Sequence, residues 1–528
     1  MDEFYQEAPR LGNQYDDDAL LRQYLKWRLP QAMRDEIEPE LRALGASAAG
    51  EWLALAEAAE ATPPRHVPYD AWGRRVDDIV VSDAWRSLDR ISAETGMVAT
   101  AYERAHGPLS RVHQMVKLYL FHPSSATYSC PLAMTDGAAR LLELYGDERT
   151  RHALAHLTSR DPARFWTSGQ WMTERTGGSD VSRTSTVARR SDTAGTFRLS
   201  GTKWFTSATT AQMAVTLARI EGAPEGSRGL SVFVVELRDA DGALRGIRVN
   251  RLKDKLGTRA LPTAELTLCD APAQLIGGEG DGVRKIAALF NVTRVYNAVA
   301  AVAGMRRAIA LARDYATRRR AFGKPLIEHP LHAATLDDLD ERFRAAFLLT
   351  FQVVELLGKA ECGTASDTEL AILRLLTPVA KLYTAKEAVA IASEAIESFG
   401  GAGYVEDTGL PRLLRDAQVL PIWEGTTNVL SLDVWRAIER TDALAPWLRD
   451  ARERVQHARD GAASDSAASL SASLDAIERE VAAARHAAER EAGARRLAFA
   501  IARAAAGVRL LEHVPTPARP LSPSATLA

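Results

Sequence analysis

Five short segments set the architecture of this chain: FRLSGTKWFT (residues 197–206), AQMAVTLARI (211–220), GLSVFVVEL (229–237), GIRVNRL (246–252) and AELTLCD (264–270). Val, Thr, Leu and Phe recur in them with a period close to two, and Gly, Asp and Ser separate them. Both features are typical of antiparallel strands joined by turns. We therefore predict a β unit that runs from Phe165 to about Ala271.

The sequence on both sides of this unit has helical character. Before it, apolar residues recur three and four positions apart in residues 20–30 and 36–61, and a Pro-containing break follows at 62–70. After it, the same spacing predicts four helices, which are 282–317 (with a polar interruption around Asn291), 336–360, 369–399 and 427–439. A β unit between two helical regions is an unusual arrangement.

The end of the chain differs again. Residues 461–473 have low complexity and predict a linker, residues 474–513 predict one or two helices, and the Pro- and Ser-rich residues 515–528 are expected to be disordered. We predict an α+β fold that is mostly α. Its four parts are an N-terminal helical domain (1–165), a middle antiparallel, barrel-like β domain (166–275), a four-helix-bundle-like domain (276–440) and an additional helical segment with a disordered tail (441–528).

The composition argues against several classes of protein. The 528 residues carry a formal net charge of −2, which gives no overall attraction to nucleic acid or to an anionic membrane. Three widely spaced cysteines without CxxC spacing predict neither a disulfide framework nor a metal site, and they fit a reducing cytoplasm. We see no apolar N-terminal signal and no run of about 18 uncharged apolar residues, so we expect no membrane span.

Three motifs combine flexible backbone, aromatic rings or cations. Residues 172–180 (MTERTGGSD) would let backbone approach a polar heterocycle or a phosphate, although a tight, self-capped turn explains them equally well. Residues 203–207 (KWFTS) would cover one face of a planar ligand, but aromatic residues in strands more often pack in the core. Residues 318–325 (RRRAFGKP) suit a pyrophosphate, yet also a solvated helix end.

Two further motifs lie nearer the C-terminus. Residues 399–404 (FGGAGY) contain more glycine than a helix cap requires, which indicates close approach of backbone to a ligand. In residues 422–428 (IWEGTTN), apolar neighbours would exclude water from Glu424 and favour a role as a general base. The alternative is an ordinary acid near a helix N-terminus.

Taken in order on this α–β–α plan, the five motifs resemble the acyl-CoA dehydrogenase superfamily over residues 70–440. Further details are similar to its AidB branch, which responds to alkylation: YDAWGRRVD (69–77), CPLAMT (130–135), LKDKLG (252–257) and a Trp before Glu424. The resemblance implies a cytoplasmic, homotetrameric flavoprotein of fatty acid metabolism. Its substrate would be an acyl-CoA thioester, and an electron-transfer flavoprotein is a candidate acceptor.

The resemblance also implies roles for individual residues. Glu424 would be the catalytic base that removes the α-proton, while N5 of FAD accepts the β-hydride. The residues implied to bind FAD are Met172, Thr173, Gly178, Ser179, Phe205, Ser207, Glu397, Gly400, Gly401, Thr426 and Asn428, with Arg319 and Phe322 reaching the FAD of a neighbouring subunit. Arg294, Thr293 and Ser179 would lie near the substrate.

Some residues depart from the family pattern. Arg175 stands where the family usually has Pro, Glu397 where many members have Gln, and Pro330 where Gln is common. These changes weaken the expected affinity for FAD slightly.

The alternative reading is an AidB-like, DNA-associated flavoprotein with weak dehydrogenase activity. Residues 441–528 hold 12 Arg, no Lys and 11 acidic residues, a net charge of about +1, whereas DNA binding needs clustered excess cation. A patch of Arg436, Arg495, Arg496, Arg503 and Arg509 remains open, but we do not favour DNA as a partner.

Overall fold

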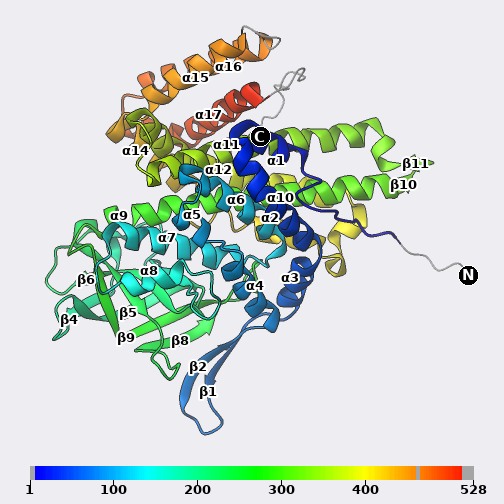
Figure 1. Ribbon diagram of the computed structural model, residues 1–528. Helices are drawn as coiled ribbons and strands as arrows, with labels where there is room; N and C mark the ends of the chain where they lie inside the picture. The colour runs from blue at the N-terminus through cyan, green and yellow to red at the C-terminus, as the bar shows by residue number, and fades with distance from the viewer. Residues whose placement is uncertain (1–5, 460–463, 514–528) are drawn as a thin grey trace, which may run out of the picture.

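The computed structural model describes residues 6–459 and 464–513. A helical N-terminal region comes first, a β-sheet follows at one side of the molecule, and long helices then cross its centre (Figure 1). The last helices stack on these long helices at the side away from the sheet (Figure 1). The predicted class, mostly α with one inserted β unit, is confirmed.

The N-terminal region is built around helices that are buried to different degrees. Its helices are α1 (Ala19–Arg28), α2 (Gln31–Ala49), α3 (Glu51–Ala61), α4 (Asp83–Glu94), α5 (Ala99–Glu103), α6 (Ser110–Phe121), α7 (Ser129–Tyr145) and α8 (Arg151–Leu157). Helix α6 is buried on all sides, because its charged residues find partners inside the protein. It therefore forms the centre of this region.

This region also contains a hairpin that the sequence did not predict. Strands β1 (Arg65–Tyr69) and β2 (Arg75–Val80) pair in antiparallel fashion and project from the body of the molecule (Figure 1). The Asp70 side chain accepts hydrogen bonds from the backbone N–H groups of Trp72 and Arg74 and so closes the turn. The prolines of this stretch had indicated only a break between helices.

The middle sheet closes on itself. Its strands are β3 (Ser168–Trp171), β4 (Val187–Arg190), β5 (Thr196–Ser207), β6 (Met213–Ile220), β7 (Leu230–Glu236), β8 (Ile247–Leu252) and β9 (Thr263–Ile276). The order β6-β4-β5-β9-β7 returns to β6 through a β6–β7 pairing, which agrees with the predicted barrel-like form. The prediction of antiparallel pairing is wrong for β3–β6 and β4–β6, which are parallel. Strand β6 is almost wholly buried, as parallel strands usually are.

Three long helices form the core of the second helical region. The elements are α9 (Gly282–Lys285), α10 (Ala287–Arg318), α11 (Pro330–Glu361), α12 (Asp367–Glu397), α13 (Leu410–Ala417) and α14 (Thr427–Thr441), with a small hairpin of β10 (Arg320–Ala321) and β11 (Lys324–Pro325). The helix expected from residue 282 is interrupted at Ile286 and not around Asn291, which lies inside α10. A half-buried Asn is tolerated within a helix, so its polarity gave a wrong signal.

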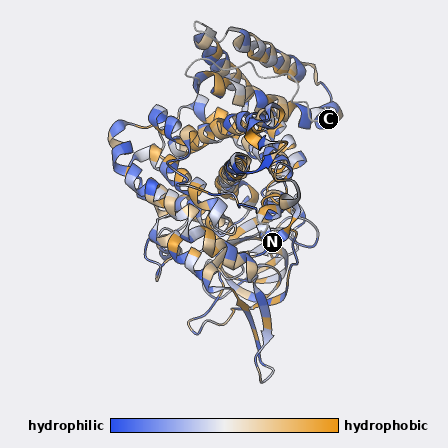
Figure 2. Ribbon diagram, turned by 90° about the vertical axis from the view of Figure 1, so that its right-hand side faces the viewer, coloured by the Kyte–Doolittle hydropathy of each residue, from blue (hydrophilic) through white to orange (hydrophobic). Residues whose placement is uncertain are grey.

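One segment has the length and hydropathy of a membrane-spanning helix. It is Gly282–Arg318, but 72% of its most apolar window is buried inside the protein. Within the described residues this segment is a core helix that contacts α7, α11 and α12. Figure 2 shows both hydrophilic and hydrophobic residues along the helices of the molecule, as expected for helices with one buried side.

The additional segment forms α15 (Leu444–Arg459), α16 (Ser464–Ala483) and α17 (Ala487–His513). The predicted linker is therefore wrong from Ser464 onward. Ala467, Leu470, Leu474 and Ile477 are buried at three- and four-residue spacing, and α16 packs on α17. The expected disordered tail, 515–528, lies outside the described residues.

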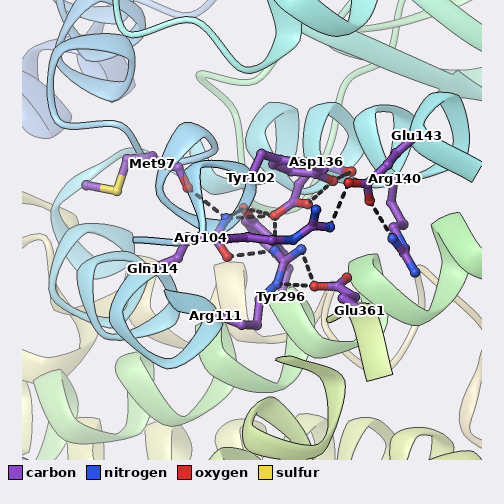
Figure 3. Close-up of polar contacts among 10 residues, drawn as sticks. All are labelled: Met97, Tyr102, Arg104, Arg111, Gln114, Asp136, Arg140, Glu143, Tyr296 and Glu361. Carbon is purple, nitrogen blue, oxygen red and sulfur yellow. Dashed lines mark hydrogen bonds and ion pairs between the residues drawn. The ribbon is translucent and has the colours of Figure 1, made fainter. Parts of the chain in front are cut away.

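A buried polar network fixes α7 against α10 (Figure 3). Asp136 of α7 accepts hydrogen bonds from Tyr102 at 2.8 Å, from Gln114 at 2.7 Å and from Tyr296 of α10 at 2.9 Å. It also pairs with Arg111, whose guanidinium contacts a second buried carboxylate. Because every charge has a partner, burial of these groups is tolerated. The network sets the spacing between two helices that border the candidate site.

Candidate active site

Glu424 lies in a loop just before α14 and is held by residues from two other elements. The hydroxyl of Thr293, on α10, donates to Glu424 Oε2 at 2.6 Å. The side-chain amide of Gln170, on β3, donates to the same oxygen at 3.5 Å. The backbone of Glu424 is left-handed, with φ of 56°, which is a strained conformation for a non-glycine residue. The fold thus holds this carboxylate in one orientation, although the backbone there is strained.

A buried lysine holds the loop on both sides of the carboxylate. Lys381, on α12, is fully buried and donates from Nζ to Trp423 O at 2.6 Å and to Gly425 O at 2.7 Å. Burial lowers the pKa of Lys381 to about 7, although the nearby Glu424 carboxylate opposes this effect. Neither Lys381 nor Gln170 was predicted from the sequence. The only signal for Lys381 is its position as a single Lys in an apolar stretch of α12.

The aromatic motif at the end of β5 is linked to Glu424 through strand β3. Ser207 is the last residue of β5. Its backbone carbonyl accepts a hydrogen bond from the indole N–H of Trp171 at 3.5 Å, and its hydroxyl lies 3.1 Å from the hydroxyl of Thr263. Trp171 follows Gln170 in β3, so adjacent residues of one strand contact Ser207 and Glu424. Phe205 is 43% exposed and therefore offers a ring face to a ligand. The structure brings these motifs together although they are far apart in the sequence.

The Gly-rich loop and the aromatic motif form one unit. Glu174 of the loop pairs with Lys203 of β5 at 2.8 Å, and both side chains are buried. Despite burial, Lys203 and two neighbouring hydroxyls lower the pKa of Glu174 to about 2. The Trp204 N–H donates to Thr173 O at 3.0 Å. The same loop carries Met172, which is buried, and Gly178 and Ser179, which are exposed.

Other predicted residues lie far from Glu424 within this chain. Arg319 follows the end of α10, roughly 40 Å along the helix from Thr293, and Phe322 sits at the tip of the β10–β11 hairpin with 97% exposure. Glu397 ends α12, and a Cβ placed on Gly400 or Gly401 would meet no atom within 4 Å. One chain alone does not assemble these residues around the carboxylate.

The remaining predicted residues surround the N-terminus of α14. Thr426 occupies the N-cap position, and Asn428 accepts a hydrogen bond from Arg495 of α17 at 3.2 Å. Arg294 forms an ion pair with Asp433 at 2.8 Å, so its guanidinium is partly engaged inside the protein.

The structure does not support a surface patch of all five C-terminal arginines. Arg509 is buried, and Arg496 pairs with Glu480 at 2.9 Å. The other four, including Arg496, are exposed. The buried guanidinium of Arg509 is not available to a DNA phosphate, so the candidate patch is smaller than predicted.

Comparison with known proteins agrees with this architecture. Residues 7–161 match the family model of the adaptive response protein AidB N-terminal domain, 169–271 that of the acyl-CoA dehydrogenase middle domain, and 280–439 that of its C-terminal domain. Acyl-CoA dehydrogenase family member 11 of Caenorhabditis elegans is 44% identical and covers 97% of this chain and 85% of its own length. AidB of Escherichia coli (strain K12) is 34% identical over 77% of this chain and 75% of its own.

A solved structure extends the likeness to three dimensions. The crystal structure of Caenorhabditis elegans ACDH-11 in complex with C11-CoA superposes with a TM-score of 0.93 at 44% identity. It covers 97% of this chain and 89% of that chain.

Proposed function

Because the chain belongs to the acyl-CoA dehydrogenase family, we propose that it oxidises the Cα–Cβ bond of an acyl-CoA thioester, with FAD as cofactor and Glu424 as base. One observation carries the assignment of the base. The Glu424 carboxylate is fixed by Thr293 and Gln170, and the next residue of the same strand, Trp171, contacts the end of β5. The resemblance to the family assigns the base to the same residue.

The residues present fit FAD. The half-exposed ring of Phe205 provides a flat apolar surface for a ring system. Gln170 Oε1 is buried and has no hydrogen-bond partner within residues 6–459 and 464–513, so a donor on a bound group would satisfy it. Gly177, with φ of 132°, leaves open space where a side chain would stand and allows close approach to backbone. When bound, FAD would supply the two-electron acceptor that this chemistry needs.

The chain's own residues orient the substrate and move one proton. Both donors to Glu424 end on Oε2, which leaves Oε1 without a donor from the described residues and free to take the α-proton. Thr293 and Lys381 prevent rotation of the carboxylate and movement of its loop. The α-proton of a thioester is weakly acidic, so hydrogen-bond donors must also polarise its carbonyl.

The test is an anaerobic titration of the purified yellow protein with saturated acyl-CoAs. We expect loss of flavin absorbance in proportion to formation of the 2-enoyl-CoA product. A protein that binds FAD but forms no enoyl product with any acyl-CoA would overturn the proposed reaction. A protein that binds no FAD would overturn the cofactor assignment.

We further propose a homotetramer in the cytoplasm that serves fatty acid metabolism and passes electrons to an electron-transfer flavoprotein. Large exposed aromatic side chains support association between copies, since Phe322 is 97% and Tyr404 91% exposed. The acyl-CoA complex of the Caenorhabditis elegans protein supports a fatty acyl substrate. Light scattering at several protein concentrations tests the assembly, and a monomer throughout would contradict it.

A further inference from the structure

A chain of hydrogen bonds runs from Lys255, in the loop after β8, to Ser207 at the end of β5. The Lys255 ammonium donates to the backbone carbonyls of Thr258 and Leu261 at 2.6 Å and 2.8 Å. Its third hydrogen bond goes to Thr263 Oγ1 at 3.1 Å. The Thr263 hydroxyl lies 3.1 Å from that of Ser207. All three donors of the ammonium are therefore engaged, and one of them acts on the hydroxyl that contacts Ser207.

The chemistry of these three side chains sets the direction of the chain. An ammonium can only donate, so Thr263 Oγ1 accepts from Lys255. The proton of Thr263 then has two acceptors in reach, Ser207 Oγ at 3.1 Å and the carbonyl of Leu261 at 3.4 Å, and the shorter distance favours Ser207. The Ser207 hydroxyl has no other partner within residues 6–459 and 464–513. Its own proton is therefore free for donation to a bound group.

The Ser207 side chain faces the same side of β5 as the Phe205 ring. The two residues are two positions apart in the strand, and Thr206 between them is buried, with its hydroxyl on the carbonyl of Ala264 at 2.7 Å. Phe205 is 43% exposed and Ser207 is half-buried, so a ring system bound on this side can reach both. The indole of Trp171 restrains the backbone of Ser207 through its carbonyl.

Lys255 also lies in the part of the molecule that holds the proposed base. Burial and the charge of Glu424 raise the pKa of the Cys130 thiol on α7 to about 12, and the charge of Lys255 opposes this shift. The thiol is therefore within electrostatic reach of both groups. The hydrogen-bond chain thus begins near the carboxylate and ends at the strand that presents the aromatic ring.

We propose that Lys255 is a positioning residue that acts through Thr263 and holds Ser207 as a hydrogen-bond donor toward FAD. The proposal rests on the proposed function, because it takes FAD to lie against Phe205 and Ser207. A cation at the start of a hydrogen-bond chain polarises each donor that follows, so Ser207 is a stronger donor than an isolated serine. A donor polarised in this way stabilises the electron density that FAD gains on reduction.

Loss of the proton from Lys255 would reverse the chain. Burial lowers the pKa of Lys255 from 10.5 to about 8. The neutral amine has a lone pair, so Thr263 can donate to it, and Ser207 then donates to Thr263. The Ser207 proton therefore points toward FAD below about pH 8 and away from FAD above it.

Three other titratable groups face Lys255, and they come from three helices. They are Cys130 on α7, Glu60 on α3 and Asp416 on α13. Burial raises the pKa of each of them, and that of Cys130 reaches about 12. The thiol is therefore neutral when Lys255 titrates, and replacement of Lys255 distinguishes its titration from that of the two carboxylates.

The first experiment follows the visible spectrum of the FAD-loaded protein without substrate, from about pH 6 to about pH 9. We expect a step in flavin absorbance with a midpoint near pH 8 in wild type and no step in Lys255→Met. The step should also be lost in Thr263→Val, which keeps the lysine, and return in Thr263→Ser, which restores the hydroxyl. A step that persists in Thr263→Val would overturn the chain. If Lys255→Met does not fold, the two Thr263 variants decide the question.

The second experiment measures the midpoint potential of bound FAD near neutral pH. Lys255→Met and Thr263→Val should each lower the equilibrium constant for reduction about tenfold, which is about 30 mV for a two-electron couple. The matched control is Lys285→Met, because Lys285 is also buried and also donates to two carbonyls, those of Gly278 and Gly280, at 2.7 Å each. We expect the control to keep the wild-type potential. An equal shift in the control, or no shift in Thr263→Val, would overturn the proposal.

Spectra without substrate separate this proposal from the proposed function. A pH step without enoyl product from any acyl-CoA would support the hydrogen-bond chain and contradict the reaction. Enoyl product together with a flavin spectrum that does not change with pH would keep the reaction and overturn the chain. A protein that binds no FAD would overturn the cofactor assignment and, with it, the role of Ser207.

Discussion

Replacement of Lys381 by methionine should damage both stability and catalysis. The change keeps the length of the side chain but removes the donor to Trp423 O and Gly425 O. A buried carbonyl left without a donor costs about 1–3 kcal/mol, so two such groups predict a loss of about 2–6 kcal/mol in the free energy of unfolding. The strained backbone of Glu424 would also lose the contacts that hold it at φ of 56°.

Denaturant unfolding and steady-state kinetics measure the two effects. The matched control is Lys386→Met, because Lys386 lies on the same helix but is only half-buried. We expect Lys381→Met to lower kcat about 10- to 100-fold, as a catalytic group that loses its orientation does, and the control to change neither quantity. Equal unfolding free energies and equal kcat in the two variants would refute the assigned role of Lys381.

Other consequences follow from the same contacts. The pKa of Glu174 is lowered to about 2 from an ordinary value of 4.5. Its contribution to the free energy of unfolding is therefore complete above about pH 4.5 and is lost as the pH falls toward 2. Unfolding measured across this pH range should show the loss in wild type and not in Glu174→Gln. The free energy of unfolding of Glu174→Gln should also fall by about 3–5 kcal/mol, because Lys203 stays buried without its partner. Adding Lys203→Met to this variant should recover part of the loss. Additive losses in the double variant would argue against coupling between the two residues. Thr293→Val should lower kcat about tenfold through lost orientation of Glu424, with an acyl-CoA affinity close to that of wild type; an unaltered kcat would show that Gln170 suffices.

The sequence predicted the architecture because the change of hydrophobic period at Phe165 and the return of helical spacing after Gly282 are local signals. It failed where composition hid the pattern. The Ala- and Ser-rich start of α16 concealed buried residues at helical spacing, and prolines concealed the β1–β2 hairpin.

The site was predicted only in part for a related reason. Glu424 lies in a recognisable motif, but its partner Gln170 is 254 positions away and has no motif of its own. Lys381 acts on backbone carbonyls, which no sequence pattern displays. Contacts of this kind follow from the packing of β3, α10 and α12, so they become visible only in three dimensions.

Anaerobic titration of Glu424→Gln with acyl-CoA tests the role of the carboxylate directly. Glutamine keeps the size and an acceptor for Thr293 but is not a base for the α-proton. The account predicts a yellow protein that binds acyl-CoA with near-normal affinity and shows no loss of flavin absorbance. Bleaching at the wild-type rate in this variant would contradict it.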